Sequence, residues 1–289
     1  MLNFKKIEIG DRAWVNEILS RSERVSLEYN FTTMFIWGDI YNTEIAERDG
    51  VLLCSSGEDD KQFLFPIGED FAGVLRELDE YTNGRMSFYA LTKTQCEILE
   101  KIYPGRFSFR EDRDSEDYIY KTETLTELRG KKLSAKRNHI NRFFMDYSDW
   151  KYEKITEKNI SEAAEMSEKW FAENEKSEAL MQEKQAVAYA FKYFDELHLT
   201  GGLLKVGNEA AAFSIGDELN KNTFLVHIEK ALSEFKGAYS VINNLFATNA
   251  CAGYKLVNRE EDTGDEGLRK AKLSYQPFRL AEKYSAVSK

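Results

Sequence analysis

The chain is poor in the residues that mark several classes of protein. Its three cysteines, Cys54, Cys96 and Cys251, are odd in number, far apart and never in a CxxC pair. A disulfide-stapled fold and a cysteine-based metal site are therefore not expected. Only three prolines occur among 289 residues. Any domains should therefore be joined closely and not by a loose proline-rich linker.

Long apolar runs are also lacking. The first residues do not form the hydrophobic segment of a signal peptide, and no window has the length and apolarity of a membrane span. We therefore expect a cytoplasmic location. Hydrophobic residues make up 42% of the chain and aromatic residues 13%, which is enough to build a substantial core.

Negative charge is concentrated in the first part of the chain. Residues 1–128 hold 15 Lys and Arg against 26 Asp and Glu, whereas residues 129–289 hold 25 against 24. Because an acidic surface repels anions, a site for an anionic ligand is expected in the second part.

The pattern of apolar and turn residues predicts the same order of elements twice. In the first part, a helix that carries Trp14, Ile18 and Leu19 and a second one, capped by Ser26, that carries Tyr29, Phe31 and Phe35 precede three short strands. A helix, a strand, a helix and further strands at 107–110 and 117–122 follow. In the second part, helices at 160–173 and 178–197 precede strands at 202–206, 210–217 and 223–229. A helix at 238–250, a strand at 255–259, a helix at 267–274 and a last strand at 278–286 follow.

This order predicts an α/β (α+β) fold with two mixed sheets flanked by helices. We place the domains at 1–128 and 129–289, the second beginning with a basic connecting helix at 129–145. The first domain is expected to be non-catalytic. Its turn at 66–70 corresponds in the order of elements to the turn before the helix at 238–250. Glu69 and Asp70 place two carboxylates there, so an anion would be repelled.

Several segments carry a resemblance to a known family. They are 29–31 with 35–37, 128–142, 227–231, 237–239 and 258–277. In these segments the chain resembles the C-terminal domain of phosphatidylglycerol lysyltransferases and its uncharacterised bacterial relatives. The resemblance implies two tandem GNAT-like acyltransferase domains, related to the Fem-type aminoacyltransferases. It departs from the lysyltransferases in having no transmembrane portion, which puts a lipid substrate in question.

The strand-to-helix passage at 227–239 is the first candidate site. His227 and Glu229 are two residues apart, so on a regular strand they share one face, opposite Phe224, Val226 and Ile228. Either could take a proton from an attacking amine, because histidine in particular titrates near neutral pH. A structural His–Glu contact is the alternative.

The helix entrance that follows is a candidate anion site. Gly237 and Ala238 begin the expected helix, whose free N–H groups would attract a phosphate or carboxylate, with Lys236 and Tyr239 beside them. The resemblance places the pyrophosphate of coenzyme A at this position. Only one glycine lies between Ala231 and Ala252, so the glycine-rich loop of such sites is missing.

Two charged stretches complete the candidates. In the segment 258–272, Asn258, Glu261 and Asp262 are candidate acceptor or loop contacts. Arg269 and Lys272, three apart on a helix, are candidate clamps for the donor's anionic group. No metal is expected there, because the acids lack the calcium-loop spacing and no His or Cys accompanies them. A solvated charged surface is the alternative.

The basic stretch between Arg129 and Arg142 contains no acidic residue from Gly130 to Met145. Lys132, Lys136 and Arg137 are its candidate contacts to RNA or anionic headgroups. The alternative is a helix that docks through its apolar residues while its charges stay in water.

Two functions follow from these features. One is an acyl- or aminoacyltransferase that uses acyl-CoA or aminoacyl-tRNA as co-substrate, without a tightly bound cofactor. It would act on an amine or hydroxyl of a small-molecule or lipid-like acceptor, and tRNA would be a partner. The other is a non-catalytic module of the same fold that binds an anionic or nucleotide-like ligand. The missing glycine-rich loop favours the second.

Overall fold

The computed structural model describes residues 2–22, 26–174 and 177–289. The chain forms two compact units. The first unit contains residues 1–117, 261–264 and 280–289, and the second contains 118–260 and 265–279.

The first unit is built on a seven-stranded sheet with the order β1-β2-β3-β4-β5-β14-β6. Its strands are β1 (Lys5–Lys6), β2 (Glu44–Arg48), β3 (Val51–Ser56), β4 (Gln62–Phe63), β5 (Ser87–Leu91), β6 (Phe107–Glu111) and β14 (Tyr284–Ser288). Its helices are α1 (Arg12–Ser20), α2 (Phe31–Ile36), α3 (Phe71–Tyr81) and α4 (Lys93–Ile102), with 3-10 turns η1 (Ile9–Asp11), η2 (Leu27–Tyr29) and η3 (Arg113–Ser115).

Local sequence accounts for several of these boundaries. Asp49 and Gly50 both adopt positive φ, as the tight turn between β2 and β3 requires. Thr92 begins α4 through a reciprocal capping arrangement with Gln95. The core lies between the sheet, α3 and α4, where Phe63, Phe88 and other apolar side chains are buried.

The C-terminal strand β14 lies inside the first sheet, between β5 and β6. Just before it, the Lys283 ammonium lies 2.6 Å from Glu28 and 2.7 Å from Asp117; Lys283 and Asp117 are buried, and the Glu28 side chain is 16% exposed. The Asp117 carboxylate also accepts a hydrogen bond from the Leu27 amide at 2.8 Å. This buried ion cluster fastens the C-terminal segment to the start of the first unit.

The second unit is built on a seven-stranded sheet with the order β13-β7-β12-β11-β10-β9-β8. Its strands are β7 (Asp117–Lys121), β8 (Trp150–Lys154), β9 (Thr200–Val206), β10 (Glu209–Asn220), β11 (Thr223–Ala231), β12 (Leu256–Asn258) and β13 (Arg279–Ala281). Its helices are α5 (Thr122–Glu127), α6 (Ser134–Asp146), α7 (Ile160–Glu173), α8 (Glu178–Lys192), α9 (Ala238–Asn249) and α10 (Glu266–Leu273), with the 3-10 turn η4 (Lys131–Leu133).

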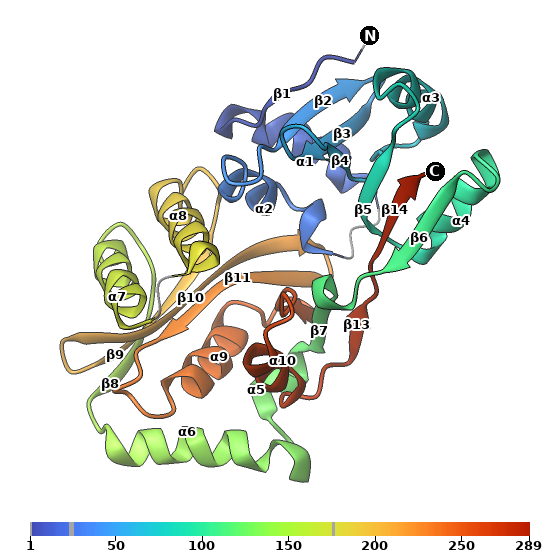
Figure 1. The fold of residues 1–289 in the computed structure, drawn as a ribbon. Helices are drawn as coiled ribbons and strands as arrows, with labels where there is room; N and C mark the ends of the chain where they lie inside the picture. Colours follow the sequence, from blue (N-terminus) through green and yellow to red (C-terminus); the bar gives the residue numbers. More distant parts are fainter. Residues whose placement is uncertain (1, 23–25, 175–176) are drawn as a thin grey trace. The chain divides into compact units, whose positions relative to one another are not determined.

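Helices cover both faces of this second sheet (Figure 1). α7 and α8 pack on one face, where Phe191 meets Phe213 of β10. α9 packs on the other face, where Phe246 meets Phe224 of β11. α6 then packs on α9. The predicted mixed sheets flanked by helices are thereby confirmed.

Each sheet is completed by a strand from a distant part of the sequence. The hairpins β2-β3-β4 and β9-β10-β11 are antiparallel, and each leads through a helix to a parallel strand, β5 or β12. Next to that parallel strand lies β14 in the first sheet and β7 in the second. The predicted strand at 278–286 is wrong as a single element, because it divides into β13 and β14, which belong to different sheets.

The predicted boundary at 128/129 divides the chain once along its sequence, whereas each sheet contains a strand from the other side of that boundary. β7 and α5 precede this boundary but belong with the second unit. No described helix combines the length and apolarity that a membrane crossing needs.

Candidate functional site

The centre of the second unit contains two parallel strands that pair over a short distance. Thr223–Leu225 of β11 pair with Leu256–Asn258 of β12. β12 ends there, while β11 continues to Ala231 along β10. The carboxyl ends of parallel strands are where α/β proteins usually bind their ligands. The polar side chains that follow the last paired residues therefore form the candidate site.

A β-bulge at His227 sets the direction of these side chains. Ile228 pairs with Ile215 and Val226 with Gly216, so His227 is an extra residue in β11. The prediction that Glu229 lies on the face opposite Phe224 is wrong. Glu229 and Phe224 both contact α9, because the bulge interrupts the alternation on which the prediction rests.

His227 lies between two carboxylates. Its Nε2 is 3.1 Å from Asp217 of β10, and its Nδ1 is 3.0 Å from Glu260, which follows β12. Burial lowers the pKa of His227, but the two carboxylates outweigh it and raise the pKa to about 10. The imidazole is therefore protonated at neutral pH, and its two nitrogens donate to Asp217 and Glu260.

Glu229 occupies a different set of contacts on the α9 side. Its Oε1 accepts from the Arg259 guanidinium at 2.8 Å, and its Oε2 accepts from the Asn243 amide at 3.1 Å. The partly buried Arg259 packs against two aromatic rings, its guanidinium carbon 5.6 Å from the centroid of Tyr120 and 4.9 Å from that of Tyr275. Glu229 is thus a partly buried carboxylate near the end of β11, oriented by two hydrogen bonds.

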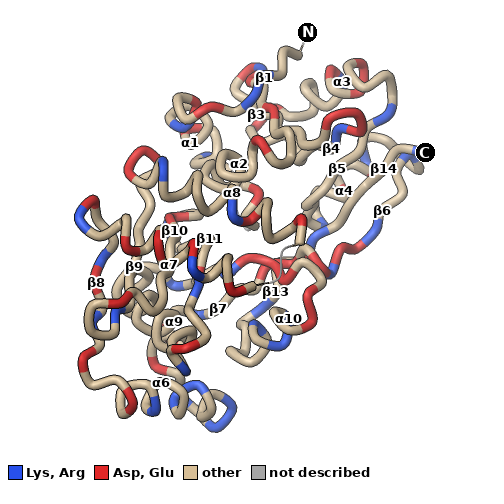
Figure 2. Tube along the Cα trace, turned by 60° about the vertical axis from the view of Figure 1, so that its left-hand side comes forward, with Lys and Arg blue, Asp and Glu red and all other residues tan. Residues whose placement is uncertain are grey.

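The three predicted basic contacts of the 129–145 stretch separate in the structure. Lys and Arg gather at the start of α6 and in the segment before it (Figure 2). Lys132 is exposed, whereas Arg137 donates to the carbonyls of Leu128 and Gly130 and so closes the end of α5. Lys136 turns inward, and its ammonium lies 4.1 Å from the Tyr275 ring centroid.

Gly237 begins α9 with a positive φ of 94°. A Cβ at this position would lie 2.9 Å from the His139 carbonyl of α6, so glycine allows the two helices to approach each other closely. Ala238 is buried and Lys236 is exposed. The Tyr239 hydroxyl accepts a hydrogen bond from the Trp170 indole at 3.0 Å.

Arg269 and Lys272 of α10, the expected contacts to the donor's anionic group, differ in their exposure. Lys272 is buried and its ammonium donates to the Arg259 carbonyl at 2.6 Å, where β12 has ended. Arg269 is partly exposed. Lys272 therefore holds the chain around Arg259, and its ammonium is turned away from solvent.

The expected loop contacts divide between the two units. Asn258 is buried in the second unit, and its side-chain oxygen accepts from the Glu260 amide at 2.7 Å. Glu261 and Asp262 belong to the first unit. Asp262 is fully buried, 3.6 Å from Arg113, and accepts from the Gly264 amide at 3.0 Å.

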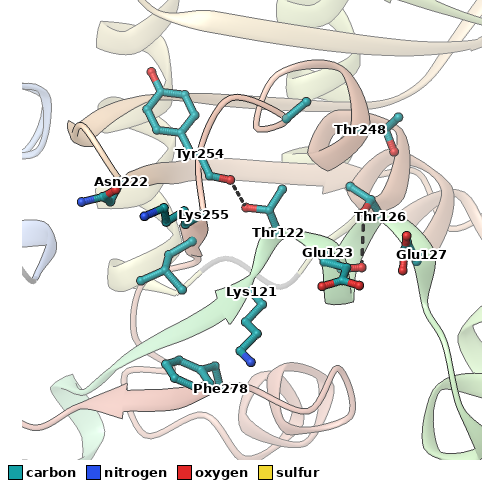
Figure 3. Close-up of a pocket in the computed structure, with 12 residues that line it drawn as sticks. Lys121, Thr122, Glu123, Thr126, Glu127, Asn222, Thr248, Tyr254, Lys255 and Phe278 are labelled. Carbon is teal, nitrogen blue, oxygen red and sulfur yellow. Dashed lines mark hydrogen bonds between the residues drawn. The ribbon is translucent and has the colours of Figure 1, made fainter.

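A cavity of about 870 Å³ lies at the opposite ends of the same strands (Figure 3). Its lining includes Asn222 before β11, Leu256 at the start of β12, and Lys121 with Phe278. Within it the Thr122 hydroxyl donates to the Tyr254 carbonyl at 2.7 Å. None of the predicted site residues lines this cavity, which faces the amino ends of β11 and β12.

Thiol chemistry has no support in the described structure. Burial raises the pKa of Cys54 and Cys251 to about 12 and that of Cys96 to about 11. These thiols are therefore protonated near neutral pH and make poor nucleophiles. Among the described residues, no group of three or more His, Cys, Asp and Glu side chains is placed to hold a metal ion.

A family model described as "Phosphatidylglycerol lysyltransferase, C-terminal" matches residues 20–287. The chain belongs to this family. The resemblance predicted from the sequence is thereby confirmed.

Several solved structures have a similar fold. A conserved protein of unknown function from Bacteroides thetaiotaomicron VPI-5482 is 39% identical, with a TM-score of 0.95 and full coverage of both chains. L-PGS from Bacillus licheniformis is 16% identical over 94% of this chain and 90% of its own, with a TM-score of 0.66. A GNAT-family acetyltransferase from Colwellia psychrerythraea is 12% identical over 99% of both chains, with a TM-score of 0.51. The fold is two tandem GNAT-like domains, as predicted.

Sequence reasoning missed several residues that complete the candidate site. They are Asp217, Asn243, Arg259, Glu260 and Tyr275. Arg259 was predicted as the last residue of the strand at 255–259, but it was not named as a site residue. Its place directly after the buried strand residue Asn258 was a signal that it lies at a strand's carboxyl end.

Proposed function

We propose that the chain is an acyl- or aminoacyltransferase whose reaction takes place at the carboxyl ends of β11 and β12. The donor would be an aminoacyl-tRNA or an acyl-CoA, and the acceptor an amine or hydroxyl. Membership of the lysyltransferase C-terminal family and the GNAT-like fold support this class of reaction. Neither identifies the donor.

One observation carries the proposal. Beyond the short pairing of β11 with β12, Glu229 presents a carboxylate held from both sides by Arg259 and Asn243. A group fixed in this way can orient an attacking amine or hydroxyl and take its proton as the new bond forms. Glu229 is accordingly the proposed base.

His227 has a different proposed role. Because it is protonated between Asp217 and Glu260, it is poorly suited to accept a further proton. It would instead fix Glu260, and with it the backbone that leads from Asn258 to Arg259 and onward. We assign it as a positioning residue.

In the reaction, the acceptor's lone pair would attack the donor carbonyl carbon and form the new amide or ester bond. The ester or thioester bond to tRNA or CoA would then break, and the leaving oxygen or sulfur would regain a proton. Positive groups near the carbonyl oxygen would stabilise its developing charge. Arg259, which is paired with Glu229, is the proposed cation for this role.

A non-catalytic binding module of the same fold is the second candidate. It is favoured by the start of α9, where Gly237 lies against the His139 carbonyl and the helix entrance is occupied by α6. A donor phosphate would have little room at that position.

A transfer assay distinguishes the two. The full chain is incubated with radiolabelled aminoacyl-tRNA or radiolabelled acetyl-CoA, each with a panel of small amines, hydroxyl compounds and phospholipid vesicles. The proposal expects label to move from at least one donor to an acceptor, and that donor to raise the melting temperature. Stabilisation by a nucleotide or CoA without any transfer would favour the binding module and contradict the enzyme.

A further inference from the structure

Two cationic side chains of the second unit rest on the ring of Tyr275. The Lys136 ammonium is 4.1 Å and the Arg259 guanidinium carbon 4.9 Å from its centroid. Tyr275 itself is buried. Burial and the neighbouring Arg259 charge lower the pKa of Lys136. Two like charges on one ring are unfavourable unless an anion offsets them.

The charges around Glu229 do not balance. Glu229 forms an ion pair with Arg259 at 2.8 Å, which leaves one positive charge, that of Lys136. Within the described residues, no carboxylate lies within ion-pair distance of Lys136. The cluster of Lys136, Arg259 and Tyr275 beside Glu229, called here the Tyr275 cluster, therefore suits a ligand with one negative charge.

Hydrogen-bonding groups in the same place also lack partners. Arg259 Nη1 is buried and meets no acceptor among the described residues. Asn243 is only 3% exposed, and while its Nδ2 donates to Glu229, its Oδ1 meets no donor in the described part of the chain. An unsatisfied buried donor or acceptor costs roughly 1–3 kcal/mol, so such groups usually meet a ligand or water.

We propose that the Tyr275 cluster binds an oxyanion, a phosphate or a carboxylate carried by a small molecule. The oxyanion accepts from Arg259 Nη1 and from the Lys136 ammonium. An amino group next to the oxyanion donates to Asn243 Oδ1 and faces Glu229. The ligand class is therefore a small amine that bears an oxyanion, such as an amino acid or an aminoalkyl phosphate.

Only one step of this inference rests on the proposed function. If Glu229 takes the acceptor's proton, the amine held beside it is the acceptor of the transfer. Binding of the oxyanion does not depend on any donor or on any turnover. The binding measurement therefore tests the site separately from the reaction.

The test is a calorimetric titration of the full chain at constant ionic strength. The ligands are inorganic phosphate, acetate, glycine and phosphoethanolamine. The wild type is compared with Lys136→Met, which keeps most of the apolar stem, and with Lys132→Met, a control at an exposed lysine near the same helix.

We expect saturable binding of at least one oxyanion, weakened about tenfold or more by Lys136→Met and unchanged by Lys132→Met. Glycine should bind more tightly than acetate, or phosphoethanolamine more tightly than phosphate. Glu229→Gln should strengthen the binding of inorganic phosphate, because it removes the negative charge that faces the site.

The site is overturned if no oxyanion saturates the wild type, or if Lys136→Met and Lys132→Met bind alike. Phosphate binding without transfer from any donor would refute the proposed function and leave the site standing. Transfer that proceeds equally well in both lysine variants, with unaltered oxyanion affinity, would refute the site and leave the proposed function standing.

Discussion

At the scale of single residues, the most unusual group is the protonated imidazole of His227. Its pKa of about 10 in the folded chain lies well above the usual value near 6.5. Between pH 6.5 and 10 the folded state therefore keeps a proton on His227 that the unfolded state has released. The stabilisation is complete below about pH 6.5 and is lost as the pH rises toward 10.

A matched substitution isolates this effect. Between pH 6.5 and 9.5 the free energy of unfolding of the wild type should fall relative to that of His227→Gln, by up to about 1.4 kcal/mol per pH unit. Urea titrations of both proteins at several pH values measure the difference. A difference that stays constant over this range would show that His227 carries no proton in the folded state.

Gly237 offers a second test at this scale. Gly237→Ala requires an unfavourable positive φ and puts a Cβ 2.9 Å from the His139 carbonyl, so the free energy of unfolding should drop by about 1–3 kcal/mol. Gly253→Ala is the control, because no atom lies within 4 Å of its added Cβ. Equal stability of the two variants would mean that α6 and α9 do not pack as described.

At the scale of elements, β14 is the strand on which the first unit depends. It lies between β5 and β6, and the buried Lys283 just before it meets Glu28 and Asp117. Removing one partner of a buried ion pair leaves charge without compensation. The C-terminal segment is therefore a central part of the first sheet.

Lys283→Met should lower the free energy of unfolding by about 3–5 kcal/mol. The exposed Lys289→Met at the end of the same segment is the control. Adding Glu28→Gln and Asp117→Asn to Lys283→Met should recover part of the loss, since the stranded negative charges are then removed. Denaturant unfolding measures all four proteins. A loss under 1 kcal/mol in the single variant would contradict the buried cluster.

Much of the fold was predictable at this scale because helices and hairpins are encoded locally. The helix at 160–173 has the predicted bounds, and the Asp49-Gly50 turn joins the predicted strands. The placement of β7 in the second sheet and of β14 in the first was not predictable, because pairing between strands distant in sequence leaves no local pattern. The bulge at His227 was equally hidden, because a single extra residue looks like ordinary alternation.

At the scale of the whole molecule, the repeated order of elements was visible in the sequence and produces two sheets of the same plan. Their charges differ, which is why an anionic ligand was expected in the second part. The sequence favoured the segment 201–272 for the site, and the proposed site draws on it, but the contacts among its side chains were not foreseen. Arg259, Asn243 and Lys136 meet Glu229 or Tyr275 only after α6, α9 and the segments that follow β12 and α10 have packed beside β11.

Glu229, as the base that assists transfer, is the central residue of the proposed function. The decisive measurement is the single-turnover rate of acyl transfer, from whichever donor the wild type uses, in Glu229→Gln and in Glu218→Gln. Glu218 is an exposed carboxylate on the neighbouring strand β10 and serves as the control. We predict that Glu229→Gln slows transfer about 10²–10⁴-fold while the variant remains folded, with a cooperative melting transition, although the loss of the ion pair with Arg259 lowers its melting temperature. Transfer at the wild-type rate in a folded Glu229→Gln protein would contradict the account.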